Sequence, residues 1–494
     1  MTPSGTAGIA ERWSLSPRPP LPGATALAAR HRPCHLRPPP PPEEPVPTIK
    51  PFRALRYERE TIGDLAQVTS PPYDVILPDE HRALLARHPR NVVRLDLPAE
   101  EAGDEPDERY RRAAHTFAAW RSDGTFHRDP RPSLYVYEQD YVVPGTNVSR
   151  TQRGFLARLR LESFGPGSNV LPHERTLSAP REDRYKLIRA TGANMSPVVG
   201  LYEDPSGRAA AILAEMAGGA GAAADITDAD RVRHRLWVVP ADKAAGESAR
   251  LVGELIDLAA AGPITIADGH HRYETALRYR DERRMTRSCD EDPAYDYLLT
   301  LFLESTAEPL TVLPTHRVVN GLGSQAGARL LAAAGELFDV RPVDDRSSLS
   351  ATFGPAAQMA DPGAGRRGRF GLWTRDGGAI LTARRSTFES GLPEGGAALR
   401  RLDVTLLQVA LERLLGIDPA ATAAGGSVRY TKSVDEALGW VEDGLDGADA
   451  AFLLEATPVA DIVAVARDGD VMPQKSTYFF PKPLSGLVIN PHEW

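Results

Sequence analysis

The densest group of chemically useful side chains in the sequence is DGHHR, in which Asp268, Gly269, His270, His271 and Arg272 follow one another directly. An alternating apolar stretch precedes it and apolar residues at helical spacing follow, which predicts a strand, a turn and a helix. Free backbone N–H groups and the positive end of the helix dipole favour an anion at such a position. Arg272 matches phosphate oxygens, and Asp268 is a residue type that binds Mg²⁺ beside phosphates. The stretch therefore predicts a phosphate cradle with Asp268 as the metal ligand.

Two other interpretations of these residues stay open. The first is an ordinary capped helix whose polar side chains are simply solvated. The second is a transition-metal site that uses His270 and Glu274, which are four residues apart and share one helical face. Because no third ligand is evident nearby in the sequence, a zinc site is disfavoured.

Two further clusters carry residues that suit phosphate chemistry. LPHERT, which contains His173 and Glu174, follows the glycine-rich turn GPGSNV. A histidine and a glutamate in a loop are most often only solvated. The polar residues of MPQKSTYFFPKPLSG can contact phosphate, although the glycine-rich loop of a Walker motif is missing. These polar residues are Lys475, Ser476, Thr477 and Lys482.

The aromatic residues of the same C-terminal stretch also fit a strand that packs into the core. Both interpretations hold together, because alternate residues of a strand face opposite sides. Two shorter motifs, SPPYDV at residues 70–75 and LPTHRVV at residues 313–319, are additional candidates that we interpret as structural.

The segments that must position these clusters alternate between strand and helix patterns. SLYVYEQDYVV and QRGFLARLRL predict two strands joined as a hairpin, and HRLWVVPA predicts another strand. SARLVGELIDLAAAG places Leu251, Leu255 and Leu258 on one helical face, and Gly262 is expected to end that helix. The fold class that follows is α+β (mixed α/β), with several antiparallel strands.

Composition and charge exclude several classes of protein. The chain has 494 residues, 42% hydrophobic and 25% charged, with a net charge of -8, so a general nucleic-acid binder is disfavoured. Cys34 and Cys289 form no C-x-x-C pair, which fits a reducing cytoplasm. No apolar run approaches the roughly 20 residues of a membrane helix, and no secretory signal pattern is evident.

Residues 1–48 form an expected disordered tail, because five consecutive prolines, residues 38–42, are accompanied by almost nothing to bury. A wrongly assigned start codon is the rival explanation of this segment.

In order, PFRALRY, PPYDV, PHERT, DGHHRYETAL, PTHR and MPQKSTYFFPK resemble the bacterial and archaeal proteins grouped as domain of unknown function 1015. This resemblance covers residues 52–494, and DGHHRYETAL and MPQKST are its most specific parts. A more distant resemblance is to the free-serine kinases of the ParB/sulfiredoxin-like superfamily, which carry a PHE loop, a DGHHR turn and a C-terminal Pro-Lys-Thr-Thr. It implies a ParB/sulfiredoxin-like nucleotide-binding core with additional N-terminal and inserted α/β segments.

The resemblance to the kinases also implies roles for individual residues. Glu174 would be the catalytic base, with His173 and Asp268 beside it in the catalytic group. The nucleotide phosphates and Mg²⁺ would be handled by Asp268, Gly269, His270, His271 and Arg272. The transferred phosphate or the substrate would meet Lys475, Ser476 and Thr477. The spacing between PHE and DGHHR is longer here, and no residues that would bind the amino and carboxylate groups of serine are identified.

The expected division of the chain follows the motifs. The predicted parts are a tail (1–48), an N-terminal α/β region (49–165), a core with PHE and DGHHR (166–320), an α/β insertion or lobe (321–420) and a C-terminal segment that completes the site (421–494).

The function that these patterns favour is a cytoplasmic small-molecule kinase. It would transfer a phosphoryl group from ATP or ADP, with Mg²⁺, to a hydroxyl group, and free L-serine giving O-phosphoserine is the favoured acceptor. Neither nucleic acid nor a membrane is expected as a partner. The alternatives are a non-catalytic ParB-like nucleotide-binding regulator and a relict site in an interaction protein.

Overall fold

The computed structural model describes residues 46–176, 178–219, 221–286, 291–306, 310–323, 326–360 and 367–493. Cys34, Cys289 and all but the last residues of the predicted tail lie outside these ranges. Glu44–Trp494 forms one compact unit.

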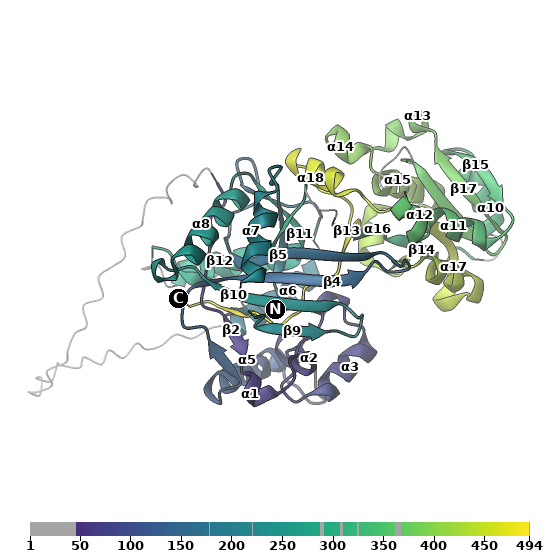
Figure 1. The fold of residues 1–494 in the computed structure, drawn as a ribbon. Coiled ribbons are helices and arrows are strands. Elements are labelled where there is room, and N and C mark those ends of the chain that lie inside the picture. Colours follow the sequence, from purple (N-terminus) through teal and green to yellow (C-terminus); the bar gives the residue numbers. More distant parts are fainter. Residues whose placement is uncertain are drawn as a thin grey trace, which may run out of the picture. The chain divides into compact units, whose positions relative to one another are not determined.

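A mixed nine-stranded sheet forms the framework for the candidate site (Figure 1). Eight of its strands follow one another in the order β6 (Val170–Leu171), β11 (Ile264–Asp268), β8 (Val198–Tyr202), β12 (Tyr297–Glu304), β5 (Ser149–Arg160), β4 (Ser133–Val142), β10 (Arg233–Pro240) and β9 (Ala224–Thr227). The short strand β1 (Ile49–Lys50) also pairs with β5. β6 is parallel to β11 and β8 is parallel to β12, whereas the other pairs are antiparallel. The predicted mixed α/β class is confirmed.

The predicted hairpin is present as β4 and β5, with Tyr135 opposite Leu156. Side chains alternate across the sheet, so Leu134 and Val136 enter one buried cluster while Tyr135 and Tyr137 enter the other. A sheet that buries both faces needs a layer on each side, and helices supply both layers.

On one face lie the helices that follow β6 in sequence. They are α6 (Ser178–Thr191), α7 (Arg208–Gly218), α8 (Glu247–Ala259) and α9 (His270–Thr286), with the 3-10 turns η2 (Lys243–Ala245) and η3 (Ala294–Asp296). Leu251 and Leu255 of α8 are buried as the pattern predicts. α8 ends at Ala259, before Gly262, and the Ala261 N–H bonds to the Leu258 carbonyl three residues back in a tighter final turn.

The N-terminal part of the chain contributes the helices α1 (Arg59–Ile62), α2 (Leu65–Val68), α3 (Pro78–Arg87), α4 (Val93–Asp96) and α5 (Glu108–Ser122), and the turn η1 (Tyr73–Val75). Leu65 and Phe117 from this group belong to the buried cluster on the other face of the sheet. The strands β2 (Leu55–Tyr57) and β3 (Phe126–Arg128) pair beside them. Among the residues that the structure describes, no helix is both long and apolar enough to cross a membrane.

A second, antiparallel sheet lies in the C-terminal part. Its order is β15 (Phe338–Val343), β17 (Gly377–Ala383), β16 (Arg369–Thr374), β19 (Ala448–Leu453), β14 (His316–Asn320) and β18 (Val428–Thr431). The helices are α10 (Ala326–Ala334), α11 (Arg346–Phe353), α12 (Pro355–Ala360), α13 (Arg385–Phe388), α14 (Ala397–Arg400), α15 (Asp403–Leu415), α16 (Pro419–Ala424), α17 (Val434–Asp443) and α18 (Val459–Arg467), with the turns η4 (Glu389–Gly391) and η5 (Leu445–Gly447). Val318 of β14 packs with α11 and α17, and Val319 faces the opposite side.

The last residues return from the second sheet to the first, as the yellow segment of Figure 1 shows. β20 (Tyr478–Phe480) pairs with β13 (Thr311–Leu313), and β21 (Asn490–Pro491) pairs with β7 (Ala193–Asn194). Further on, Ser70 and Ser485 form an isolated antiparallel bridge. The C-terminal segment thus runs beside the elements that carry the sequence motifs.

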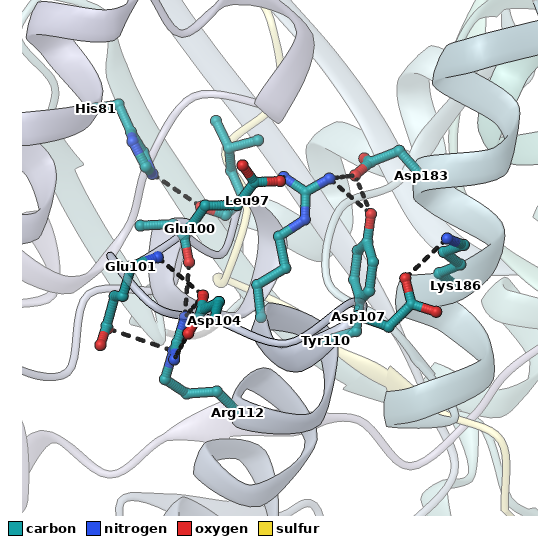
Figure 2. Close-up of polar contacts among 12 residues, drawn as sticks. His81, Leu97, Glu100, Glu101, Asp104, Asp107, Tyr110, Arg112, Asp183 and Lys186 are labelled. Atoms are coloured by element: carbon teal, nitrogen blue, oxygen red, sulfur yellow. Dashed lines mark hydrogen bonds and ion pairs between the residues drawn. The ribbon is translucent and has the colours of Figure 1, made fainter.

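Polar contacts hold α6 against α5 and the loop that precedes it (Figure 2). The Tyr110 hydroxyl donates to the Asp183 carboxylate at 2.7 Å, and Lys186 pairs with Asp107 at 2.7 Å. The loop is itself fixed, because Arg112 binds Asp104 at 2.8 Å. These contacts position α6, which directly follows the PHERT motif.

We expect Gly154→Ala to destabilise the sheet, because a Cβ at this position of β5 would meet the Phe302 carbonyl oxygen and lie 2.7 Å from Leu303 Cδ2. Overpacking of this kind costs about 1–3 kcal/mol. Gly253→Ala on α8 is the matched control, since nothing lies within 4 Å of its added Cβ and alanine favours the helix. Urea unfolding should show a lower midpoint for the first variant and an unchanged or higher midpoint for the second. Equal midpoints would contradict the close strand approach.

Candidate functional site

The parallel pairing of β6 with β11 brings the PHE and DGHHR motifs together. Val170 lies opposite Ile264 and Leu171 opposite Thr265. The carboxyl ends of parallel neighbours reach the same edge of a sheet, where ligands of open α/β sheets bind. His173 and Glu174 follow β6, and Asp268 ends β11, so the three predicted catalytic residues meet at this edge.

The DGHHR turn has the predicted strand–turn–helix form. Gly269 adopts φ +90°, and a Cβ there would lie 2.8 Å from Val198 Cγ1 and 3.0 Å from Arg272 Nε. Only glycine adopts this backbone conformation without strain while leaving room for the arginine. α9 begins at His270, which places His270, His271 and Arg272 in its first turn as predicted.

The carboxylate of Asp268 holds two cations. Its Oδ2 accepts a hydrogen bond from Arg272 Nη2 at 2.7 Å, and its Oδ1 pairs with Lys482 Nζ. Burial would raise the pKa of Asp268, but Lys482 and Arg272 outweigh it and hold the pKa well below its usual range. Arg272 Nη1 also donates to the Pro197 carbonyl, and Arg272 Nε has no hydrogen-bond partner within the part of the chain that the structure describes. The guanidinium is therefore largely committed within the protein, and its predicted phosphate contact stays a prediction.

His173 is a buried, neutral histidine. Its Nδ1 lies 2.5 Å from the Ile266 carbonyl and its Nε2 lies 3.1 Å from Thr477 Oγ1. A carbonyl accepts only, so Nδ1 carries the proton and Nε2 accepts from the threonine hydroxyl. Burial lowers the pKa of His173 to about 4. Its backbone N–H donates to His270 Nε2 at 3.2 Å, which ties the two motifs together.

Glu174 differs from the carboxylate of Asp268, because no cation among the described residues pairs with it directly. The residue is half-buried, and its Oε1 accepts the backbone N–H of Lys475 at 3.1 Å. Burial raises the pKa of Glu174 to about 7, and Asp268 adds to the rise, while Lys475 and Lys482 act in the opposite direction. A carboxyl group that titrates near neutral pH is suited to exchange a proton with a substrate.

The three residues of the C-terminal motif occupy different environments. Lys475 has an exposed side chain and φ +53°, in a turn whose backbone N–H meets Glu174. Ser476 is buried, and its hydroxyl donates to the Pro473 carbonyl. The Thr477 hydroxyl donates to Nε2 of His173. The Lys475 N–H and the two hydroxyls are therefore all engaged within the protein, and the exposed side chain of this motif is the Lys475 ammonium.

The SPPYDV motif also approaches the cradle. Asp74 raises the pKa of His271, which burial and Lys475 otherwise lower. Tyr73 lies beneath the guanidinium of Arg184, with 3.9 Å between Cζ and the ring centroid. Arg184 is buried and paired with Asp96 and Asp183, the latter being the α6 carboxylate in Figure 2. The network of Figure 2 thus supports one wall of the site.

Sequence reasoning missed two cations that the second sheet contributes, Arg317 and Lys432. Lys432 follows β18, and its Nζ lies 4.0 Å from the Tyr478 ring centroid; Lys482 Nζ lies 4.5 Å from the same centroid. Arg317 of β14 is buried opposite Tyr430 of β18. The PTHR motif contains Arg317, but nothing in the sequence marks Lys432, because its place depends on the return of the C-terminal segment.

A transition-metal site is not found among the described residues, where no three His, Cys, Asp or Glu side chains gather suitably. Glu274 accepts instead from Thr176 at 2.7 Å and Arg181 at 2.6 Å. Mg²⁺ is different, since it often uses one carboxylate together with substrate phosphates. Asp268, whose pKa lies well below its usual range, fits that mode, because each carboxylate oxygen has more than one lone pair.

Comparison with known proteins gives one family match. The description "Protein of unknown function (DUF1015)" matches residues 49–405, a range that includes PHE and DGHHR and ends before QKST. No curated protein matches the chain.

Several solved structures are weakly similar. A free serine kinase in complex with AMP has a TM-score of 0.32 and 12% identity, covering 64% of this chain and 86% of that chain. SbnI with a C-terminal truncation from Staphylococcus aureus has a TM-score of 0.31 and 10% identity, covering 67% and 86%. A conserved hypothetical protein from Pyrococcus furiosus has a TM-score of 0.30 and 13% identity, covering 64% and 90%. Both predicted resemblances are found, but likenesses at this level do not assign roles to residues.

We expect Glu174→Gln to stabilise the protein at pH 8 and to have little effect at pH 4. The folded pKa of about 7 lies above the ordinary value of 4.5, so ionisation disfavours the folded state and stability falls as pH rises through this window. The glutamine side chain cannot ionise, so the Glu174→Gln variant avoids this loss of stability. Thermal unfolding of both proteins between pH 4 and 8 measures the difference.

Glu254→Gln is the control, because a hydrogen bond from Arg208 lowers the pKa of Glu254. That variant should not gain stability at pH 8. A Glu174→Gln curve parallel to wild type across the whole pH range would contradict the raised pKa.

Proposed function

Because the chain belongs to the family of proteins of unknown function DUF1015, its activity has to be inferred from its site, and we propose that it is a small-molecule kinase. The reaction is phosphoryl transfer from ATP or ADP to a hydroxyl group. The observation that carries the proposal is Glu174, a half-buried carboxyl with a pKa of about 7 that lies beside a group of cations.

Each requirement of phosphoryl transfer has a candidate group here. The reaction needs charge neutralisation and an oriented nucleophile rather than much covalent chemistry from the protein. Lys475 and Lys482 supply positive charge near Glu174, and the first turn of α9 presents backbone N–H groups. Glu174 would take the proton of the acceptor hydroxyl as that oxygen attacks the terminal phosphorus. The bond from phosphorus to the bridging oxygen of the donor breaks, and the shorter nucleotide leaves.

Mg²⁺ bound to the donor phosphates would contact Asp268 and would supply further neutralisation of their charge. The neutral His173 fixes the PHE turn against Ile266 and Thr477, which holds Glu174 in place. We propose the same roles for the remaining motif residues that the sequence predicts, namely phosphate contact by His270, His271, Arg272 and Lys475.

The finer assignments also belong to this proposal. Residues 166–320 with the C-terminal segment 421–494 would form a ParB/sulfiredoxin-like core, and residues 321–420 an inserted lobe. Free L-serine is the first acceptor to test, with O-phosphoserine as the product, because it combines the predicted hydroxyl with a charge that the cations can bind.

We expect the purified protein with Mg²⁺ and either ATP or ADP to phosphorylate L-serine or another small hydroxy compound. Glu174→Gln should lower kcat by about 10²–10⁴-fold, the usual contribution of a general base, with little change in nucleotide Kd. Mass spectrometry of the products and calorimetric nucleotide titration measure the two effects. Glu182→Gln on the surface of α6 is the control and should keep full activity.

Nucleotide binding without product from any acceptor would overturn the kinase and favour a nucleotide-binding regulator. Normal turnover by Glu174→Gln would instead remove Glu174 as the base.

We further expect kcat/KM to rise with pH and to level off above about 7, because the base must be ionised and its pKa is about 7. Below the midpoint the rate should fall about tenfold per pH unit. A rate profile between pH 5 and 9, corrected for protein stability, tests this expectation. A profile that is flat through pH 7 would show that another group controls proton transfer.

A further inference from the structure

Arg317 is a buried cation without an anionic partner among the described residues. Arg317 is 1% exposed, and its Nε and Nη1 have no hydrogen-bond partner among the described residues. Tyr430 lies directly opposite on β18, with 5.7 Å between the Arg317 Cζ and the ring centroid, and a side-chain hydrogen bond joins the two residues. Burying a charge without a partner is unfavourable, so this arrangement suits a protein whose ligand supplies the anion.

Lys432 extends the same side of the second sheet. It lies two residues beyond Tyr430, in the bend that directly follows β18. Its exposed side chain places Nζ over the Tyr478 ring, the ring that Lys482 also approaches. Lys482 is neutralised by Asp268, whereas no carboxylate among the described residues pairs with Lys432. Burial and the charge of Lys482 lower the pKa of Lys432.

Glu174 is linked to these cations through the C-terminal segment. Its Oε1 accepts the Lys475 N–H at 3.1 Å, and Tyr478 of the same segment contacts both Lys432 and Lys482. The charge of Glu174 also raises the pKa of Arg317. If the donor phosphates occupy the cradle, an acceptor whose hydroxyl reaches Glu174 can extend toward Arg317, the second-sheet cation that interacts with the charge of Glu174.

We propose that Arg317 and Lys432 bind an anionic group of the acceptor, which is therefore a small hydroxy compound that carries a carboxylate or a phosphate. This inference rests on the proposed kinase function and names the class of its acceptor. Arg317 offers a guanidinium fork and Lys432 a mobile ammonium, and both geometries suit either anion.

The test compares two pairs of acceptors that differ in one anionic group. L-serine is paired with ethanolamine, and glycerol 3-phosphate is paired with glycerol. We expect at least one anionic member to exceed its neutral counterpart by about 100-fold in kcat/KM, because a site built to bind a group rejects the analogue that lacks it. The pair that shows the preference identifies carboxylate or phosphate as the anion. Equal use of the neutral and anionic members of both pairs would overturn the proposal.

Lys432→Gln should raise the KM of the preferred anionic acceptor about tenfold or more, with little change in kcat or in nucleotide Kd. Lys243→Gln, on the exposed turn η2, is the matched control and should leave all three constants unchanged. Arg317→Lys keeps the buried charge and tests the guanidinium, with thermal unfolding as a check of folding. An unchanged KM in Lys432→Gln would overturn the role of Lys432.

Calorimetric titration separates this inference from the proposed function, because binding does not require turnover. In the presence of ADP, wild-type protein should bind L-serine or glycerol 3-phosphate, and Lys432→Gln should bind that compound at least tenfold more weakly. This result without any phosphoryl transfer would keep the anion site and reject the kinase. Phosphoryl transfer to neutral alcohols, with no binding of either anion, would keep the kinase and reject the anion site.

Discussion

The ion pairs of Asp268 with Arg272 and Lys482 are the interaction on which the candidate site depends. The three side chains are only 12%, 8% and 11% exposed, so each charge has lost most of its hydration. Removing Asp268 would leave two buried cations without their shared counter-ion, which is far more unfavourable than the ion pairs themselves. Because Asp268 and Arg272 lie on the turn between β11 and α9 and Lys482 follows β20, these contacts join the DGHHR turn to the C-terminal segment.

The same interaction explains why the C-terminal segment is part of the site. The Met472 N–H donates to the His173 carbonyl at 2.8 Å, and Thr477 reaches the ring of the same histidine. Further along, Ser485 binds Asp96 at 2.8 Å. Residues close to the end of the chain thus complete a site that begins near its middle, and loops this long close late in folding. The edge of the nine-stranded sheet becomes a competent site only after that closure.

The sequence predicts the local parts of this arrangement and not the distant ones. The DGHHR strand, turn and helix, and the β4–β5 hairpin, are encoded by patterns within a few residues, and both are present. The commitment of Arg272 to the Pro197 carbonyl was not predictable, since it depends on β8 running antiparallel beside β11. The pairing of Lys482 with Asp268 was not predictable either, because it depends on the return of the C-terminal segment to β11. The catalytic roles assigned to Glu174 and its neighbours remain predictions, because contacts alone do not measure turnover.

The second sheet also affects the protonation state of Glu174 in the proposed reaction, through the charge of Arg317. A nucleotide phosphate that enters the cradle brings negative charge close to Glu174, and a like charge raises the pKa of a carboxyl group. That pKa already stands at about 7, so a further rise would leave the base protonated at neutral pH. Arg317 of the second sheet interacts with the charge of Glu174, and a cation favours the ionised form of a carboxyl group. An anionic acceptor would cancel part of this effect, so the exposed Lys475 ammonium, which lowers the pKa of Glu174, has to keep the balance positive during transfer.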